Sequence, residues 1–204
     1  MCGRYYISDD LEESIRRLLQ EDFREDGLSA LSAGSAAVRD ICPSEKAAII
    51  TGSASGSSSL ACREMTWGYP NPAGKGLLIN ARAETVRQKR MFRDGIAYRR
   101  CVIPASGFYE WDHDKNKASF SHEDRSPVWL AGFYDLFDDL LRFIILTTAA
   151  NASVKPVHDR MPCILRADQI YDWLRRDDKT DSFMSMEMPT LRRYQEYEQQ
   201  SLFL

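Results

Sequence analysis

The chain has 204 residues, of which 44% are hydrophobic and 28% are charged, and its formal net charge is −3. A chain of this composition can bury one sizeable core, and no apolar run in it approaches the roughly 18 residues of a membrane span. Disordered and integral-membrane classes are therefore excluded, and we expect a single domain over residues 1–204 with no contact to a membrane. The first residues lack the basic and apolar blocks of a secretory signal, so we expect a cytoplasmic location.

The first third of the chain predicts a strand, a helix and a hairpin. Residues 4–7 read as a strand, and Asp9 with Glu12 three positions later has the pattern of a capping box. Apolar residues then recur at helical spacing, at Leu11, Ile15, Leu18, Leu19 and Phe23. Residues 47–50 form a short apolar run, and a Gly/Ser-rich connection leads to a second strand near residues 60–67. We expect these two strands to pair as a hairpin.

Strand patterns dominate the rest of the chain. Apolar and β-branched residues predict strands at residues 77–79, 101–103, 107–111, 128–136 and 140–148. Helices are expected between residues 88 and 97 and over residues 168–175, the second with Ile170, Trp173 and Leu174 facing inward. About seven strands with two or three helices predict an α+β fold, which is a mainly antiparallel, partly barrel-like sheet with a few peripheral helices.

The five cysteines are too few and too widely spaced for a disulfide framework. They stand at positions 2, 42, 62, 101 and 163, with no C-x-x-C pair, and the chain has three histidines. Neither pattern supplies a zinc ligand set, so we expect no metal and no other cofactor. Cys101 and Cys163 lie in apolar surroundings, where a reduced cysteine usually acts as a small buried hydrophobe.

Cys2 carries a different chemistry because aminopeptidases remove an initiator Met that precedes a small residue. The mature chain would then begin with a 1,2-aminothiol, whose amine and thiol are both partly nucleophilic near neutral pH. Such a pair can attack an acyl group, as in N-terminal-nucleophile peptidases and amidases. It can also condense with an aldehyde, so that the amine forms an imine and the thiol closes a thiazolidine ring. The residue alone leaves both possibilities open.

Positive charge is concentrated in residues 82–100. Seven basic residues against Glu84 and Asp94 give this segment a charge of +5 and leave −8 elsewhere. The basic residues are Arg82, Arg87, Lys89, Arg90, Arg93, Arg99 and Arg100. A solvated helix face would explain such a cluster, and so would contact with nucleic acid.

Five sequence blocks, taken together, resemble the SOS response-associated peptidase family, the abasic-site processing proteins that crosslink to DNA. The blocks follow the family's order and span residues 1 to about 165. They are Met1–Tyr5, Met65–Gly68, Asn80–Thr85, Arg100–Trp111 and His158–Pro162.

The resemblance implies a protein that binds single-stranded DNA, or single-to-double-strand junctions, and traps the ring-opened aldehyde of an abasic site as a thiazolidine. It further implies lyase-type activity, an autopeptidase activity that removes Met1, and association with the nucleoid at damaged DNA. We expect a monomer. By position, the implied catalytic residues are Cys2, Asn80, Glu110 and His158. The implied DNA contacts are Arg4 and Arg82 to phosphates, Trp67 to a base and Pro43 at the rim of the site.

Each implied role has an ordinary structural alternative. Asn80 can hold the α-amine or a sugar hydroxyl, or can simply end a strand. Glu110, if turned inward, would have a raised pKa and serve proton transfer, whereas an outward Glu110 would be a solvated strand residue. His158 can exchange a proton or be a hydrogen-bonded loop residue. Trp67 can stack on a base or be buried in its hairpin, and we assign Trp111 to the core.

Two segments depart from the family pattern. After Trp67-Gly68 the family usually continues with a proline, a second tryptophan and a longer loop, whereas residues 69–76 here are short. The sequence from Asp177 onward also differs, so no role is carried over from it. A cysteine peptidase acting on peptides stays the alternative function. A noncatalytic single-strand binding module would not explain why Cys2, Glu110 and His158 occur together.

Overall fold

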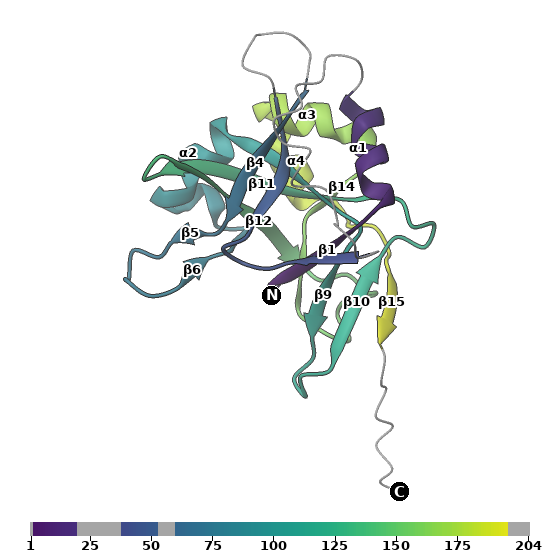
Figure 1. The fold of residues 1–204 in the computed structure, drawn as a ribbon. Helices are drawn as coiled ribbons and strands as arrows, with labels where there is room; N and C mark the ends of the chain where they lie inside the picture. Colours follow the sequence, from purple (N-terminus) through teal and green to yellow (C-terminus); the bar gives the residue numbers. More distant parts are fainter. Residues whose placement is uncertain (1, 20–37, 53–59, 196–204) are drawn as a thin grey trace, which may run out of the picture.

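The computed structural model describes residues 2–19, 38–52 and 60–195. Five of its strands form a closed ring, in the order β12, β4, β3, β8, β11 and back to β12. Neighbours in the ring are antiparallel, except that β12 and β4 pair in parallel. The strands are β3 (Lys46–Gly52), β4 (Leu60–Trp67), β8 (Arg100–Ala105), β11 (Val128–Phe137) and β12 (Leu140–Ala149). Figure 1 shows them crossing at the centre of the molecule.

Continuous apolar runs explain why these strands form the centre of the core. All six residues of β8 are buried, and five consecutive residues of β3 are buried as well. A strand with one face in water would alternate between apolar and polar residues, so the unbroken runs indicate that both faces are covered. The ring is therefore the packed, barrel-like part of the fold that the sequence predicts.

A second sheet has five antiparallel strands in the order β15, β10, β9, β1, β2. They are β1 (Arg4–Ser8), β2 (Val38–Ile41), β9 (Gly107–Trp111), β10 (Lys117–Ser121) and β15 (Arg192–Gln195). Burial alternates along β1, where Tyr5 and Ile7 are buried and their neighbours are not. The Tyr5 ring lies 5.3 Å from that of Trp67 in β4, so the buried face packs against the barrel and the other face meets solvent.

One continuous segment joins the two sheets. Only Ser106 separates β8 from β9, so residues 100–111 pass directly from the barrel into the second sheet. The Ser106 hydroxyl oxygen accepts a hydrogen bond from the backbone N–H of Ser8 at 2.9 Å, and the backbone N–H of Ser106 donates to the Tyr6 carbonyl at 2.9 Å. A side chain at Gly107 would overlap the Tyr6 hydroxyl and the Phe120 carbonyl oxygen, so this crossing requires glycine.

Short strands surround the carboxyl end of β12. There β7 (Asn80–Arg82) pairs with it in parallel and β13 (Arg160–Pro162) pairs in antiparallel fashion. In addition, β14 (Ile164–Leu165) extends the barrel sheet beside β11, and β5 (Tyr69–Pro70) with β6 (Leu77–Leu78) forms a separate small hairpin. Two distant parts of the chain, residues 80–82 and 160–162, are thereby placed around one strand.

The helices lie at the periphery, as Figure 1 shows. They are α1 (Asp10–Leu19), α2 (Arg90–Tyr98), α3 (Ile170–Arg175) and α4 (Thr180–Ser185), with short 3-10 turns at η3 (Val86–Gln88), η4 (Ala167–Gln169) and η5 (Asp177–Lys179). In α1 the residues Leu11, Ile15 and Leu19 are buried at a spacing of four, which is one face of a helix. In the described ranges, no helix is long and apolar enough to cross a membrane.

The predicted fold class, the hairpin of β3 and β4, and the helices near residues 90–98 and 170–175 are confirmed. Phe23 lies outside the described residues. The predicted number of strands, about seven, is too low, because the described residues hold fifteen strands and four α-helices. Most of the missed strands have two to four residues, too few for an alternation pattern to be visible. In β10, a lysine and two serines occupy the positions that are not buried, so its sequence resembles that of a loop.

Candidate active site and nucleic-acid interface

Cys2 lies at the point where the second sheet meets the barrel. In the register of β1 with β9, Arg4 faces Tyr109, so the residues before Arg4 run alongside the end of β9. The Cys2 side chain has no exposed surface, and its Sγ–H donates to the Arg4 carbonyl at 3.8 Å. Burial strongly raises the pKa of this thiol, and the charge of Glu110 raises it further. The thiol is therefore protonated at neutral pH.

Asn80 is bonded directly to Cys2. Its Nδ2 donates to the Cys2 carbonyl oxygen at 2.8 Å, across 78 positions of sequence. The position of Asn80 follows from β7, which pairs it with Ile145 of β12. Its Oδ1 is buried and accepts no hydrogen bond from the described residues. Asn80 thus fixes Cys2 and keeps one acceptor available beside it.

Trp67 is fully buried, which corrects the predicted contact with a base. Its Nε1–H donates to the Ile79 carbonyl at 3.0 Å, and its ring lies parallel to that of Phe143 at 6.1 Å. No ring face or edge is left for a nucleotide. Ile79 precedes Asn80, so this hydrogen bond instead supports β7, the strand from which Asn80 bonds Cys2. Trp67 is therefore a positioning residue.

Glu110 turns inward, as the inward alternative predicts. It is 2% exposed and alternates along β9 with Tyr109, which is partly exposed. Burial raises the pKa of its carboxyl group, and the nearby charge of His158, when protonated, acts against that rise. Glu110 lies near enough to the Cys2 thiol to affect its titration. A carboxyl group whose pKa is raised therefore lies beside a thiol whose pKa is raised.

His158 lies just before β13 and is held in one orientation. Its Nδ1 accepts a hydrogen bond from the Arg160 backbone N–H at 2.9 Å, so the neutral ring carries its proton on Nε2. Arg160 in turn bonds both carboxylate oxygens of Glu84, at 2.5 and 3.0 Å, and the Thr147 carbonyl at 2.7 Å. The hydrogen bond from Arg160 lowers the pKa of Glu84. This arrangement makes His158 a hydrogen-bond donor through Nε2.

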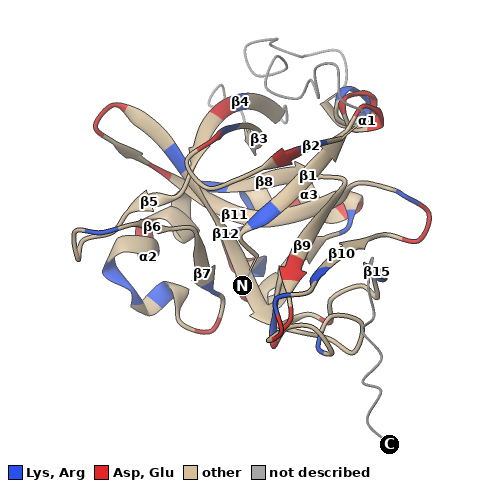
Figure 2. Cartoon of the chain, turned by 60° about the horizontal axis from the view of Figure 1, so that its bottom comes forward, with Lys and Arg blue, Asp and Glu red and all other residues tan. Residues whose placement is uncertain are grey.

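The basic segment divides into a free part and an internally bonded part. Arg82, Lys89 and Arg90 are exposed, form no ion pair with any other described residue, and line one hollow of about 580 Å³ together with Asn80. Apolar side chains of Leu78, Met91 and Phe92 form other parts of this hollow. In Figure 2 the blue segments on α2 and at the end of β7 belong to this side of the molecule. A pocket with cations and apolar walls suits a nucleotide, whose phosphate and base need both.

The remaining four arginines of the segment have internal partners. Arg87 pairs with Asp177 and Asp181, Arg93 with Asp94, and Arg99 with Asp135. Arg100 is buried and donates to the carbonyls of Ile96, Ala97 and Trp173 and to Asp177. The prediction that the whole segment extends a DNA path is therefore wrong for Arg87 and Arg100, because their charges tie the segment to η5 and α4. Arg99 is tied to β11, whereas Arg93 pairs with its exposed neighbour within α2.

Arg4 and Pro43 lie near the first residues of the chain. The guanidinium of Arg4 lies 5.5 Å from the centre of the Trp111 ring and 3.4 Å from a carboxylate oxygen of Asp40. Pro43 is partly buried in the turn after β2, the strand that pairs with β1. These positions agree with a rim around Cys2.

Trp111 corrects the assignment to the core. It is partly exposed and lines a hollow of about 400 Å³ with Lys155, His158 and Asp159. The sequence held the signal for this, because neighbours in a strand face opposite sides and Glu110 faces inward. The hollow brings Trp111 and His158 to the same opening. Over residues 2–19, 38–52 and 60–195, no group of three His, Cys, Asp or Glu side chains is arranged to hold a metal ion.

Comparison with known proteins places this site in a family. The model of the SOS response associated peptidase (SRAP) family matches residues 1–201. The chain belongs to the SRAP family. Among its relatives are the abasic site processing protein YoaM of Bacillus subtilis, 29% identical over 93% of this chain and 86% of its own length, and YedK of Escherichia coli, 29% identical over 87% and 81%. A mouse relative, the abasic site processing protein HMCES, is 27% identical over 47% of this chain and 37% of its own length.

Solved structures share the SRAP fold found here. A protein from Bacteroides thetaiotaomicron superposes with a TM-score of 0.78 at 22% identity, covering 97% of this chain and 93% of its own. One from Bordetella bronchiseptica gives a TM-score of 0.76 at 24% identity, with 95% and 99% covered. The arrangement of the two sheets is therefore a fold that experiment has also found in similar proteins.

Proposed function

We propose that this SRAP protein processes abasic sites in single-stranded DNA by forming a covalent crosslink through Cys2. Relatives that match most of the chain carry the name abasic site processing protein. The observation that carries the proposal is the bond from Asn80 to the Cys2 carbonyl, because it fixes Cys2, which would become an N-terminal aminothiol on removal of Met1, between a buried carboxyl group and a basic pocket.

The first step is the attack of the α-amine on the ring-opened aldehyde after Met1 has been removed. We assign removal of Met1 to an aminopeptidase or to the Cys2 thiol itself. The buried Oδ1 of Asn80 can accept a hydrogen bond from the amine and so direct its lone pair to the aldehyde carbon. The carbinolamine then loses water, and Glu110 supplies the proton that its hydroxyl needs to leave. The raised pKa of Glu110 suits this role, because a carboxyl group that holds its proton to higher pH than usual is better placed to act as a general acid.

The second step closes the ring. The Sγ of Cys2 adds to the carbon of the protonated imine, so a C–S bond forms while the C=N π bond breaks, and its electron pair returns to the nitrogen as the lone pair of a secondary amine. Because burial keeps the thiol protonated, it must lose a proton as it attacks, and the carboxylate of Glu110 has just become a base beside it. One proton thus passes from Glu110 to the departing water and returns from the thiol, and the sequence releases one water overall.

His158 acts on the sugar. Its Nε2–H donates a hydrogen bond, while Nδ1 is occupied by the Arg160 N–H. A fixed neutral donor can stabilise negative charge that develops on the sugar oxygen when the deoxyribose ring opens. Without ring closure by sulfur, the imine can instead lead to strand cleavage, which accounts for a lyase-type side activity.

The strand reaches the site through the hollow beside Asn80. Arg82, Lys89 and Arg90 contact phosphates there, and contacts of this kind do not read sequence. Trp67 is left out of this contact set because it is buried. A peptide substrate would have no use for three cations beside Asn80, which favours DNA over the alternative of a peptidase acting on peptides.

The test is an incubation of the protein with an abasic single-stranded oligonucleotide, followed by a denaturing gel and intact mass. We expect an adduct that is stable without borohydride in protein whose chain begins at Cys2. Cys2→Ser should give an adduct only when borohydride reduces the imine. Cys42→Ser, at the one described cysteine that is not buried, is the matched control and should behave as wild type. Absence of a stable adduct, together with turnover of an unmodified peptide, would establish the peptidase alternative instead.

A further inference from the structure

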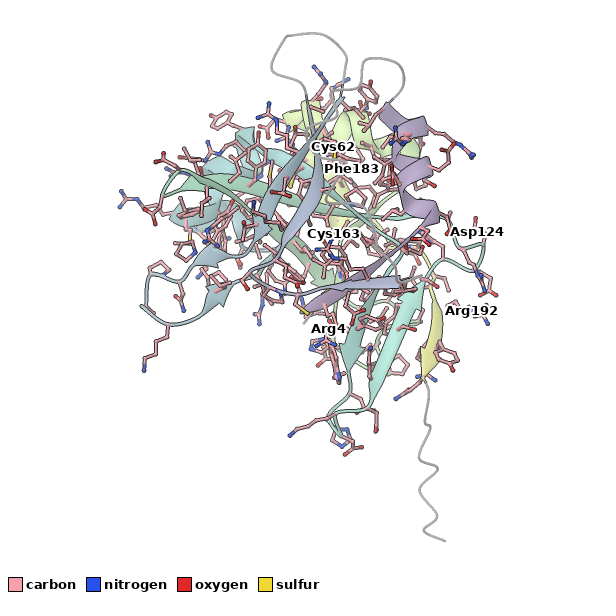
Figure 3. The ribbon with its side chains drawn as sticks, viewed as in Figure 1. Arg4, Cys62, Asp124, Cys163, Phe183 and Arg192 are labelled. Carbon is pink, nitrogen blue, oxygen red and sulfur yellow. The ribbon has the colours of Figure 1, made fainter. Side chains whose placement is uncertain are left out.

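The solvent face of the second sheet carries a row of side chains that runs away from Cys2. The register pairs Arg4 with Tyr109, Tyr109 with Ser119, and Ser119 with Tyr194, across β1, β9, β10 and β15. Residues directly opposite each other on neighbouring antiparallel strands project to the same face. With about 4.8 Å between strands, the row is roughly 14 Å long. Figure 3 shows its two ends near the labelled residues Arg4 on β1 and Arg192 on β15.

Aromatic rings form the surface of this face. The Tyr109 ring lies 5.1 Å from that of Tyr6 and 6.4 Å from that of Trp111, and all three residues are partly exposed. Tyr6 can lie over the sheet because Gly107 below it has no side chain. Tyr194 at the far end of the row is 62% exposed. Aromatic surfaces that stay in water at this density are typical of sites that stack on bases.

Cations accompany these rings. The Lys117 Nζ lies 3.7 Å from the centre of the Tyr109 ring and has no ion-pair partner in the described part of the chain. Arg4 lies over Trp111 but also pairs with Asp40, and Arg192 lies 3.7 Å from Glu123. A ring holds an ammonium group in place without cancelling its charge. Lys117 therefore presents an uncompensated positive charge in the middle of the aromatic surface.

The face is continuous with the site around Cys2. The Arg4 carbonyl accepts the hydrogen bond of the Cys2 thiol, while the Arg4 side chain lies over Trp111. Trp111 also lines the hollow that contains His158. A strand whose abasic sugar reaches Cys2 can thus continue onto this face, which β9 forms, whereas the hollow with Arg82 lies at β7.

We propose that the solvent face of the second sheet binds the single-stranded DNA that flanks the abasic site, with Trp111 and Tyr194 stacking on bases and Lys117 contacting a phosphate. This inference rests on the proposed function and adds a second stretch of the strand's path. Stacking and a phosphate contact carry no sequence preference, so the face should accept any base.

The test measures binding by fluorescence anisotropy of oligonucleotides with a tetrahydrofuran abasic analogue, which cannot form an imine. One oligonucleotide has about six nucleotides on each side, within the range of single-strand site sizes, and two others lack one arm. Wild type should bind one of the two one-armed strands, the one that lacks the arm lying on this face, more weakly than it binds the two-armed strand. Tyr194→Ala should bind the two-armed strand about fivefold more weakly, the low end for losing a stacked base, and should lose less affinity than wild type when that arm is removed. Lys117→Ala should reduce the slope of log affinity against log salt by about 0.7.

Two variants control for indirect effects. Tyr194→Phe keeps the ring and should bind as wild type does, and Tyr171→Ala removes a tyrosine of 42% exposure from α3 and should have no effect. If wild type ignores both arms, or if Tyr194→Ala and Lys117→Ala match the Tyr171 control on every strand, the proposal is overturned. A second assay distinguishes failure of this proposal from failure of the proposed function. It measures crosslinking of a short abasic strand, without the flanking arms, at saturating concentration. On this short strand, Tyr194→Ala and Lys117→Ala should both crosslink at the wild-type rate. If wild type fails to crosslink but still binds more weakly when the arm is removed, the Cys2 chemistry is disproved and the binding face is not.

Discussion

Replacing Glu110 by Gln should slow the reaction and stabilise the fold at the same time. The substitution keeps the shape of the side chain and removes its proton chemistry. Because Glu110 is 2% exposed and lies beside the Cys2 thiol, solvent cannot easily replace it as a proton donor and acceptor. We expect crosslinking to slow by about 10²-fold, the low end for a general acid or base, since the amine itself remains. The deficit should shrink at acidic pH, where hydronium can protonate the departing hydroxyl.

The effect on stability follows from the raised pKa of Glu110. A carboxyl group whose pKa is higher in the folded than in the unfolded state stabilises the fold fully at low pH, and that contribution disappears as pH rises through the folded pKa. Wild type therefore acquires an unfavourable buried charge as pH rises, which Gln does not. The difference in Tm between Glu110→Gln and wild type should become more positive from pH 4 to pH 8.

Two assays check this prediction. A single-turnover time course on an abasic oligonucleotide gives the rate, and thermal unfolding at several pH values gives the Tm. Glu123→Gln, whose side chain is 80% exposed, is the control and should change neither. A variant that loses stability and activity together at all pH values would show that Glu110 merely supports packing, and a wild-type rate would remove it from the catalytic set.

Two further substitutions test the DNA path. Arg82→Glu should weaken binding of an abasic strand and reduce its salt dependence, because it replaces an exposed cation of the hollow beside Asn80, and unchanged affinity across a salt titration would place the strand elsewhere. Trp67→Phe should lower the free energy of unfolding by about 1–2 kcal/mol, because the hydrogen bond to Ile79 and some packing are lost while the Ile79 carbonyl keeps its bond from Ile145 at 3.2 Å. Anisotropy measurements should give this variant the wild-type affinity for DNA. If it instead loses affinity while its stability in urea is unchanged, Trp67 contacts DNA after all.

Sequence patterns predicted the barrel because its strands are long apolar runs. The inward orientation of Glu110 is favoured by the family resemblance of the residues around it. Adjacent strand residues face opposite sides, so an inward Glu110 places Trp111 outward, whereas a large aromatic residue in a strand is expected in the core from sequence alone. Trp67 shows the opposite error, because an aromatic residue in a DNA-binding family was expected at the surface although it is fully buried.

Charge pairing explains the other misreading. Seven basic residues within residues 82–100 suggested one continuous DNA surface, but the partners of Arg87 and Arg100 lie in η5 and α4, 77 to 94 positions away in sequence. Counting charges along a segment cannot reveal counterions that tertiary structure supplies. The segment after Asp177, from which the family pattern predicted nothing, is where those counterions are found.

The complete burial of Cys2 also determines how the protein meets oxidants. Peroxides react with thiolates that solvent reaches, and the Cys2 thiol has no exposed surface and a raised pKa. Its sulfur is thus protected from conversion to a sulfenic acid. In the proposed reaction, the sulfur would be shielded from the same reactive oxygen species that damage DNA bases and lead to their loss, and it would react only with a carbonyl group held against the neighbouring amine.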